Sequence, residues 1–334
     1  MSILDPILSD FTSGTLAWLV QRVVDDIQAQ AGNADVKQLG VTHAYGLRAL
    51  QRMPIGQRKV AAFKRSDFIE FVKWRRDQPT RLGRKVGAAT AKQSLMHISG
   101  IIKYACATWD DCEDLVPVQI HLDAASKFCG KRGLVAKANR RTRRPSDEEV
   151  ALLLDYWKRH PGRVLRMPDV VAFCLASARR RGEVCRLKWG DVDFENQVYW
   201  VRDLKHPTKK KGNDKEFLLF PAIEQIIRRQ PRIGTDPLER VFPFVPESIT
   251  QQFIAAKKAI AVETGDDTIL TLRLHDHRAE AISKWLLSGM PPADVRLAVS
   301  GHNDTRVLET VYDRRGASDL KKKYLRGTLD EHHF

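Results

Sequence analysis

The sequence is poor in cysteine, and the few cysteines it has are not arranged as a scaffold. Five occur in 334 residues, and no two form a C-x-x-C pair or lie near histidine at the spacing of zinc ligands. Five is also an odd number, which argues against a full set of disulfides. We therefore expect reduced thiols, as in a cytoplasmic protein.

Long apolar runs and a secretory signal are also missing. No uninterrupted apolar stretch reaches the ~18 residues of a membrane span. The amino-terminal stretch 1–20 contains Asp5 and Asp10 but neither lysine nor arginine, whereas a secretory signal begins with positive charge. These absences favour a cytoplasmic protein.

Acidic residues are scarce relative to basic ones. The chain has 56 Lys and Arg against 41 Asp and Glu, a formal net charge of +15 at pH 7. A surplus of this size indicates a polyanionic partner, with nucleic acid first among them. The length and the 43% hydrophobic content predict an ordinary globular protein of about two domains.

The amino-terminal part of the chain has the apolar periodicity of helices. Between Thr15 and Ala31, apolar residues recur every three or four positions, and similar spacing predicts helices over 42–53, 66–75 and 90–108. We expect the helix over 66–75 to be capped by Ser66 and Asp67. Residues 1–123 are predicted to form a helical domain.

Residues 124–146 contain no acidic side chain, and we interpret them as a basic linker between two domains. An unbroken run of one charge sign is suited to contacts with a phosphate backbone, although such a run can also be simply solvated. The candidate DNA-binding residues are Lys131, Arg132, Lys137, Arg140, Arg141, Arg143 and Arg144.

The remaining part, residues 147–334, is predicted to be a mixed domain. Ser146 followed by three acids has the form of a helix start. Strand-like runs occur at 197–201 and 216–219, on either side of a lysine-rich loop, and helical patterns dominate elsewhere. The predicted fold class is mainly α with a small antiparallel β-sheet.

Three polar clusters in this second domain could hold a phosphate. The first is the arginine run 179–181 with Glu183, the second is the segment 275–278 with histidine and arginine three apart, and the third is Gly301-His302, ten residues before Tyr312. Each cluster alone is a weak signal, because arginines are common on surfaces and most histidines have no catalytic role.

In this order the clusters resemble the signature of the tyrosine recombinases, or phage integrase family. That signature has an arginine followed three residues later by an acid, a lysine in a β-hairpin, H-x-x-R, then G-H and a tyrosine. The amino-terminal helices followed by a basic linker resemble the family's core-site-binding domain. The resemblance implies a helical core-binding domain joined to an α+β catalytic domain.

The resemblance also implies a set of catalytic residues. They are Arg180, Lys205, His275, Arg278, His302 and Tyr312. Glu183 is expected to orient the arginine turn rather than to react. Two departures from the family pattern, Ser177-Ala178 for Thr-Gly and Ser300 for Leu before Gly-His, affect the expected loop geometry.

Several assignments have neighbours that fit almost as well. Arg179 and Arg181 flank Arg180, the lysines 209–211 are alternatives to Lys205, and His277 lies inside the H-x-x-R segment.

By resemblance, the function is site-specific DNA recombination or integration through a 3′-phosphotyrosyl intermediate, with no metal, ATP or other cofactor. The partners would be double-stranded DNA with a specific core site and three further copies of the chain in a homo-tetramer, coupled by a carboxy-terminal tail after Tyr312. The location would be the nucleoid of a bacterial or phage-infected cell. A type IB-like topoisomerase and a catalytically inactive DNA-binding regulator are the alternative readings.

Overall fold

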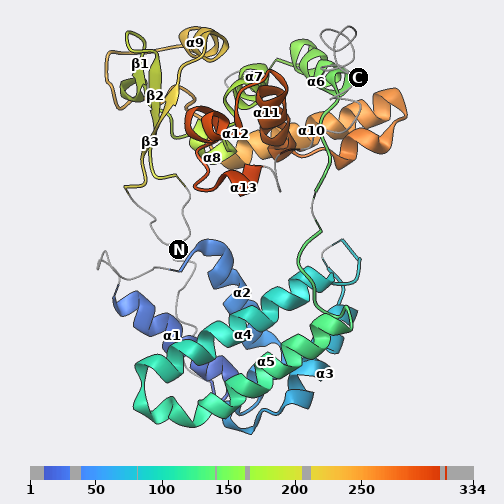
Figure 1. The fold of residues 1–334 in the computed structure, drawn as a ribbon. Helices are drawn as coiled ribbons and strands as arrows, with labels where there is room; N and C mark the ends of the chain where they lie inside the picture. Colours follow the sequence, from blue (N-terminus) through green and yellow to red (C-terminus); the bar gives the residue numbers. More distant parts are fainter. Residues whose placement is uncertain are drawn as a thin grey trace, which may run out of the picture. The chain divides into compact units, whose positions relative to one another are not determined.

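The computed structural model describes residues 11–30, 39–80, 82–139, 141–161, 166–204, 212–308 and 313. The chain divides into two compact units, Met1–Asn139 and Arg140–Phe334 (Figure 1). No helix within the described ranges is both long and apolar enough to cross a membrane.

The described part of the N-terminal unit is helical. Its helices are α1 (Leu16–Ala29), α2 (Val41–Arg52), α3 (Arg65–Asp77), α4 (Ala88–Thr108) and α5 (Val116–Lys131), with 3₁₀ turns η1 (Pro54–Gln57), η2 (Val60–Ala62) and η3 (Asp110–Leu115). Helix α1 begins where the Thr15 hydroxyl accepts the Trp18 N–H at 3.3 Å. Its periodic apolar face is buried in the core of this unit, as the sequence predicts.

Two details of this unit differ from the sequence prediction. Helix α5 extends to Lys131, so the first part of the expected linker is helical, and Pro117 is accommodated in its first turn, where no backbone N–H is needed. Helix α3 begins at Arg65, and Asp67 accepts the Lys64 N–H at 2.7 Å from the third helical position, so Asp67 is not itself the N-cap.

The C-terminal unit is mixed, with helices around a small sheet. Its helices are α6 (Asp147–Arg159), α7 (Met167–Ser177), α8 (Arg181–Val184), α9 (Pro221–Arg228), α10 (Pro246–Thr264), α11 (Leu274–Leu287), α12 (Pro292–Asp294) and α13 (Thr305–Val307). Two 3₁₀ turns, η4 (Trp189–Asp191) and η5 (Asp267–Thr271), and one π-helix, η6 (Val295–Ser300), complete the described elements outside the sheet.

The sheet is antiparallel, as predicted. Its strands β1 (Val192–Asp193), β2 (Val198–Val201) and β3 (Lys215–Leu218) lie in the order β1-β2-β3. In the register, Tyr199 of β2 is opposite Phe217 of β3, and both rings are buried in the main core of the unit. The mainly α fold with a small antiparallel sheet is thus confirmed.

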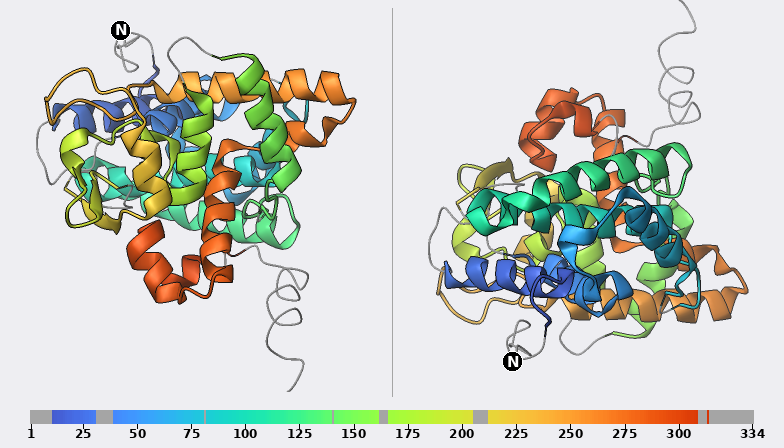
Figure 2. Two further views of the ribbon diagram at one scale, coloured as in Figure 1. Left: turned by 90° about the horizontal axis from the view of Figure 1, so that it is seen from above. Right: turned by 90° about the horizontal axis from the view of Figure 1, so that it is seen from below.

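Helix α11 is central to the C-terminal unit because it packs on α7 and on η6 (Figures 1 and 2). The π-helix also contacts β3. A small apolar cluster that includes Ala178, Ile282 and Val299 joins the end of α7, α11 and η6. This packing brings the end of α7 and strand β3 together with α11 and η6, which follow much later in the chain.

Candidate active site

The turn after α7 carries the first arginine cluster. Helix α7 ends at Ser177, and Ala178 adopts a left-handed conformation with φ 55°. Glycine is the usual residue for this conformation, so Ala178 takes the strained backbone without glycine's freedom. Its carbonyl accepts a hydrogen bond from Arg278 of α11. The turn therefore connects the two expected catalytic arginines through the backbone.

Glu183 lies among three guanidinium groups and is only 4% exposed. Its carboxylate accepts the Arg180 Nη1–H at 2.6 Å and the Arg180 backbone N–H at 3.0 Å. Arg179 and Arg278 each lie 3.9 Å from Glu183 Oε2. Burial alone would raise the pKa of Glu183, but the positive charges of Arg179, Arg278 and Arg180 lower it to about 2.

The three consecutive arginines have different environments. Arg180 is partly exposed, whereas Arg179 is 2% exposed and stacks its guanidinium 3.8 Å from the centre of the Phe217 ring. Arg179 also donates to the carbonyls of Ser177 and Val299. Arg181 donates to the Thr250 hydroxyl of α10. Arg180 and Arg181 are thus both partly exposed, with 26% and 37% of their side chains accessible, and Arg180 is hydrogen-bonded to Glu183 whereas Arg181 is directed to α10.

Arg278 and His302 contact each other in the interior of the site. Arg278 donates to the Ser300 carbonyl at 2.9 Å, and its Nη2 is 3.2 Å from His302 Nε2. Because a guanidinium can only donate, His302 Nε2 is the acceptor and the ring is neutral, with its proton on Nδ1. Burial and the charges of Arg278, Arg180 and Arg179 lower the pKa of His302 to about 3, in agreement with a neutral ring.

His275 is exposed, in the first turn of α11. It lines a cavity of about 330 Å³ together with Cys174, Arg179, Arg180, Arg181, Gly182, Thr250 and Leu274. His277, the sequence alternative, is fully buried, and its Nδ1 is 3.1 Å from the Leu274 carbonyl. Burial lowers the pKa of His277. Only His275 of the pair faces open space beside the arginines.

The loop with His302 is held by the sheet. Gly301 has φ 71°, and a Cβ there would lie 2.7 Å from Phe217 Cζ and 2.9 Å from Leu204 Cδ2. Lys215, the first residue of β3, donates to the Gly301 carbonyl at 3.0 Å and to Asn303 Oδ1 at 2.9 Å. Sequence reasoning did not single out Lys215. The available signal was a lysine at the start of a predicted hairpin strand.

The expected residues outside the described ranges are Lys205, Tyr312 and Arg140, together with the alternatives at 209–211 and the tail after Tyr312. The structure thus brings together Arg180, Arg278, Glu183 and His302, with His275 on the wall of the adjoining cavity. Among the described residues, no group of three or more His, Cys, Asp or Glu side chains is arranged to hold a metal ion.

The expected linker cations fall into two groups. Lys131, Arg132 and Lys137 are exposed and belong to the N-terminal unit. In contrast, three arginines of the C-terminal unit are bonded to carboxylates of that same unit. These pairs are Arg141 with Asp276, Arg143 with Glu149 and Arg144 with Glu280. Whether these arginines also reach DNA stays a prediction.

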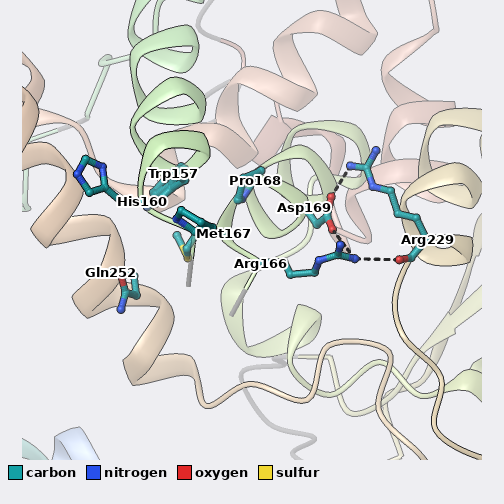
Figure 3. Close-up of a pocket in the computed structure, with 9 residues that line it drawn as sticks. Trp157, His160, Arg166, Met167, Pro168, Asp169, Arg229 and Gln252 are labelled. Atoms are coloured by element: carbon teal, nitrogen blue, oxygen red, sulfur yellow. Dashed lines mark hydrogen bonds and ion pairs between the residues drawn. The ribbon is translucent and has the colours of Figure 1, made fainter. Parts of the chain in front are cut away.

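A second cavity, of about 560 Å³, lies beside α6 and α7 and contains none of the expected residues (Figure 3). Asp169 in its wall is 2.6 Å from Arg229 and 3.9 Å from Arg166, and it accepts the Gln230 amide at 2.9 Å. The carboxylate is therefore saturated by its neighbours, and we assign this cavity no chemistry.

Comparison with known proteins identifies relatives of this chain. The model of the phage integrase family matches residues 144–317. A curated protein of Haemophilus influenzae described as a putative integrase/recombinase is 24% identical over 278 residues, which cover 82% of this chain and 80% of that protein.

Solved structures share the fold at low identity. The integrase of transposon Tn1549, in complex with transposon right end DNA, matches with a TM-score of 0.63 at 16% identity, covering 93% of this chain and 99% of that one. A lambda integrase tetramer bound to a Holliday junction matches with a TM-score of 0.62 at 16% identity, covering 90% of this chain and 78% of that one. Since the family model spans just over half of the sequence, this chain belongs to the phage integrase family, the tyrosine-type site-specific DNA recombinases.

Proposed function

We propose that this recombinase cleaves and rejoins DNA through a covalent 3′-phosphotyrosyl intermediate, with Arg180 and Arg278 as the phosphate clamp. The observation that carries the proposal is the convergence of both guanidiniums on Glu183, with His302 in contact with Arg278. A buried carboxylate that fixes two arginines leaves a net positive charge for an incoming phosphodiester. Planar guanidiniums bind phosphate oxygens in bidentate fashion.

The proposed step forms one bond to phosphorus and breaks another. The phenol oxygen of Tyr312 attacks the scissile phosphate while its proton passes to His275, and the bond from phosphorus to the 5′ oxygen breaks. Lys205 gives a proton to the departing 5′ oxygen. Arg180, Arg278 and His302 stabilise the negative charge that develops on the non-bridging oxygens. Rejoining is the reverse reaction with another 5′ hydroxyl, so neither ATP nor a metal ion is consumed.

The exposed cations of the linker region supply non-specific affinity in this proposal. Lys131, Arg132 and Lys137 would contact phosphates on either side of the cleavage site. Exchange between two duplexes needs four cleavages, so the active assembly would be a homo-tetramer on DNA, as in the lambda integrase structure. The protein would act at the nucleoid in the cytoplasm.

The test is covalent capture on a nicked DNA substrate that carries the core site. The wild-type protein should give a band that survives boiling in detergent, and Tyr312→Phe should bind the same DNA but give no such band. Tyr324→Phe is the matched control and should behave as wild type. An adduct formed by Tyr312→Phe would overturn the assignment, and a wild-type protein that binds DNA without any adduct would identify a non-catalytic DNA-binding protein.

A further inference from the structure

The segment Arg141–Arg144 is bonded along the amino-terminal half of α11, the helix that carries His275 and Arg278. Arg141 makes a bidentate pair with Asp276, with distances of 2.7 Å from Nε to Oδ1 and 2.5 Å from Nη2 to Oδ2. The same Nη2 donates to the Thr271 carbonyl at 2.6 Å. Arg144 makes a second two-point contact, to Glu280, at 2.6 and 3.2 Å.

The acceptors of these arginines lie between and beside the catalytic positions. Asp276 directly follows His275, is 1% exposed, and accepts the Arg273 N–H at 2.8 Å, which closes the first turn of α11. Glu280 is 4% exposed and lies one turn further on, two residues after Arg278. Asp276 and Glu280 are four residues apart and share one face of the helix. The two-point contacts of Arg141 and Arg144 therefore hold that face of α11 at two successive turns.

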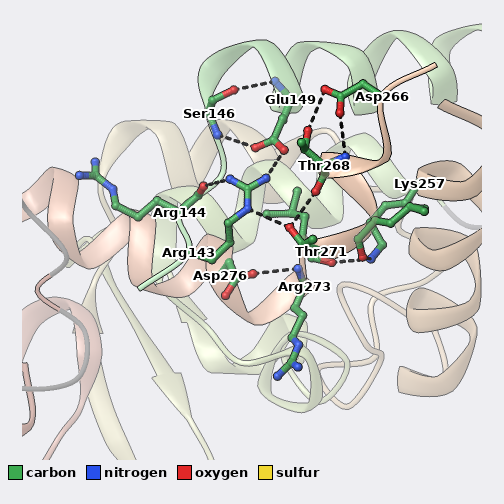
Figure 4. Close-up of polar contacts among 12 residues, drawn as sticks. Arg143, Arg144, Ser146, Glu149, Lys257, Asp266, Thr268, Thr271, Arg273 and Asp276 are labelled. Atoms are coloured by element: carbon green, nitrogen blue, oxygen red, sulfur yellow. Dashed lines mark hydrogen bonds and ion pairs between the residues drawn. The ribbon is translucent and has the colours of Figure 1, made fainter. Parts of the chain in front are cut away.

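A third arginine fastens the same segment to its surroundings (Figure 4). Arg143 pairs with Glu149 in the first turn of α6 and donates to the Thr271 hydroxyl at 3.2 Å. Thr271 ends η5, whose Leu270 carbonyl accepts the Lys257 ammonium of α10 at 2.8 Å. The chain that enters the C-terminal unit is thus joined to α6, η5 and α11 within four residues.

Burial makes these contacts hard to exchange for DNA phosphates. If Arg141 turned to a phosphate, Asp276 would remain as a nearly inaccessible carboxylate without its bidentate partner, which is strongly unfavourable. Arg144 is likewise the two-point partner of the buried Glu280, although Lys284 of α11 also lies 3.8 Å from that carboxylate. An exposed cation such as Lys137, for which the structure gives no acidic partner, meets no such obstacle.

We propose that Arg141 and Arg144 are positioning residues, which orient the first two turns of α11, and so His275 and Arg278, through Asp276 and Glu280, and do not bind phosphate. The inference rests on the proposed function, because it concerns the residues assigned to cleavage. Arg141 and Arg144 then contribute to the geometry of the active site and not to DNA affinity.

The test separates binding from cleavage. Arg141→Gln, Arg141→Lys, Asp276→Asn and the double variant Arg141→Gln/Asp276→Asn are compared with Lys137→Gln in DNA affinity at several salt concentrations and in single-turnover covalent capture. We expect Arg141→Gln to slow capture at least tenfold with unchanged affinity and salt slope. Arg141→Lys should recover part of the rate, and the double variant should be no slower than either single variant.

The opposite pattern would overturn the inference. If Arg141 binds phosphate, Arg141→Gln should weaken DNA binding and flatten the salt slope by about 0.9, as Lys137→Gln should, and Asp276→Asn should tighten binding. Capture by Arg141→Gln at the wild-type rate would also exclude a positioning role.

Amide hydrogen exchange over residues 274–284 provides a readout that needs no activity, and it should accelerate in Arg141→Gln but not in Lys137→Gln. Unchanged exchange in Arg141→Gln would count against the inference. If wild-type protein forms no adduct, the proposed function fails, and this exchange comparison still decides whether Arg141 holds the helix.

Discussion

Glu183→Gln should destabilise the C-terminal unit because it removes the negative charge shared by three guanidiniums. Arg179 and Arg278 are almost fully buried, at 2% and 1% exposure, so each would lose a counter-charge that lies 3.9 Å away. The pKa of Glu183 is about 2 in the fold against an ordinary value of 4.5. That difference corresponds to about 3 kcal/mol of stability at neutral pH.

The same two pKa values determine how the stabilisation by Glu183 depends on pH. A carboxyl group with a lowered pKa stabilises the fold fully above pH 4.5, and the stabilisation disappears as the pH falls toward 2. At pH 3 the contribution should be reduced to about 1 kcal/mol. The stability gap between the wild type and Glu183→Gln should therefore be large at pH 7 and less than half as large at pH 3.

Thermal unfolding followed by circular dichroism at the two pH values provides the measurement. For a unit of this size, about 3 kcal/mol corresponds to a decrease in Tm of roughly 6–12 °C at pH 7. Glu263→Gln is the control, since Glu263 pairs with Arg159 at 2.8 Å on the exposed surface and its loss should leave Tm unchanged. A gap below about 1 kcal/mol at pH 7, or one that is equal at both pH values, would refute the reasoning.

Two further substitutions test the loop that carries His302. In a urea titration, Gly301→Ala should lower the free energy of unfolding by about 2–4 kcal/mol, because the left-handed backbone disfavours a side chain and the added Cβ would meet Phe217 and Leu204. In the same titration Gly130→Ala, where nothing lies within 4 Å of the added atom, should stabilise α5 slightly. Lys215→Met should slow covalent capture roughly tenfold by releasing the Gly301 carbonyl and Asn303, with DNA affinity retained. Lys258→Met, at an exposed position of α10, should capture DNA at the wild-type rate.

Local patterns predict the elements whose signals lie within one turn of chain. The spacing of apolar residues gives α1 almost to the residue, and Ser146 with Glu149 forms the capping box expected at the start of α6. Helix α5 was missed although its buried positions Val118, Leu122, Ala125 and Cys129 follow helical spacing. The absence of acidic residues over 124–146 is typical of a linker, and it conceals the helical spacing at the start of that stretch.

Long-range contacts could not be predicted in the same way. The sequence indicates that Arg141 and Arg144 are free cations, because their partners, Asp276 and Glu280, lie 135 and 136 residues away. Arg179 and Arg180 are the same residue type, and only the fold shows that Arg179 is buried against Phe217 of β3 and the Val299 carbonyl while Arg180 is partly exposed. The family motif predicts which positions are catalytic, but the charge environment of each becomes visible only in the fold.

The position of His302 in the site depends on the number of residues in the π-helix η6. Its closing bond runs from the Gly301 N–H to the Arg296 carbonyl, one residue further than in an α-helix. Deleting any one residue of Val295–Ser300 would let the segment adopt regular α-helical bonding, which is a local gain. It would also rotate Gly301 and His302 by about 100° relative to α11, away from Arg278 and from the surface of β3. In this segment a shortening that improves the helix would move His302 away from Arg278, so the length of the segment is constrained even where its individual side chains are not.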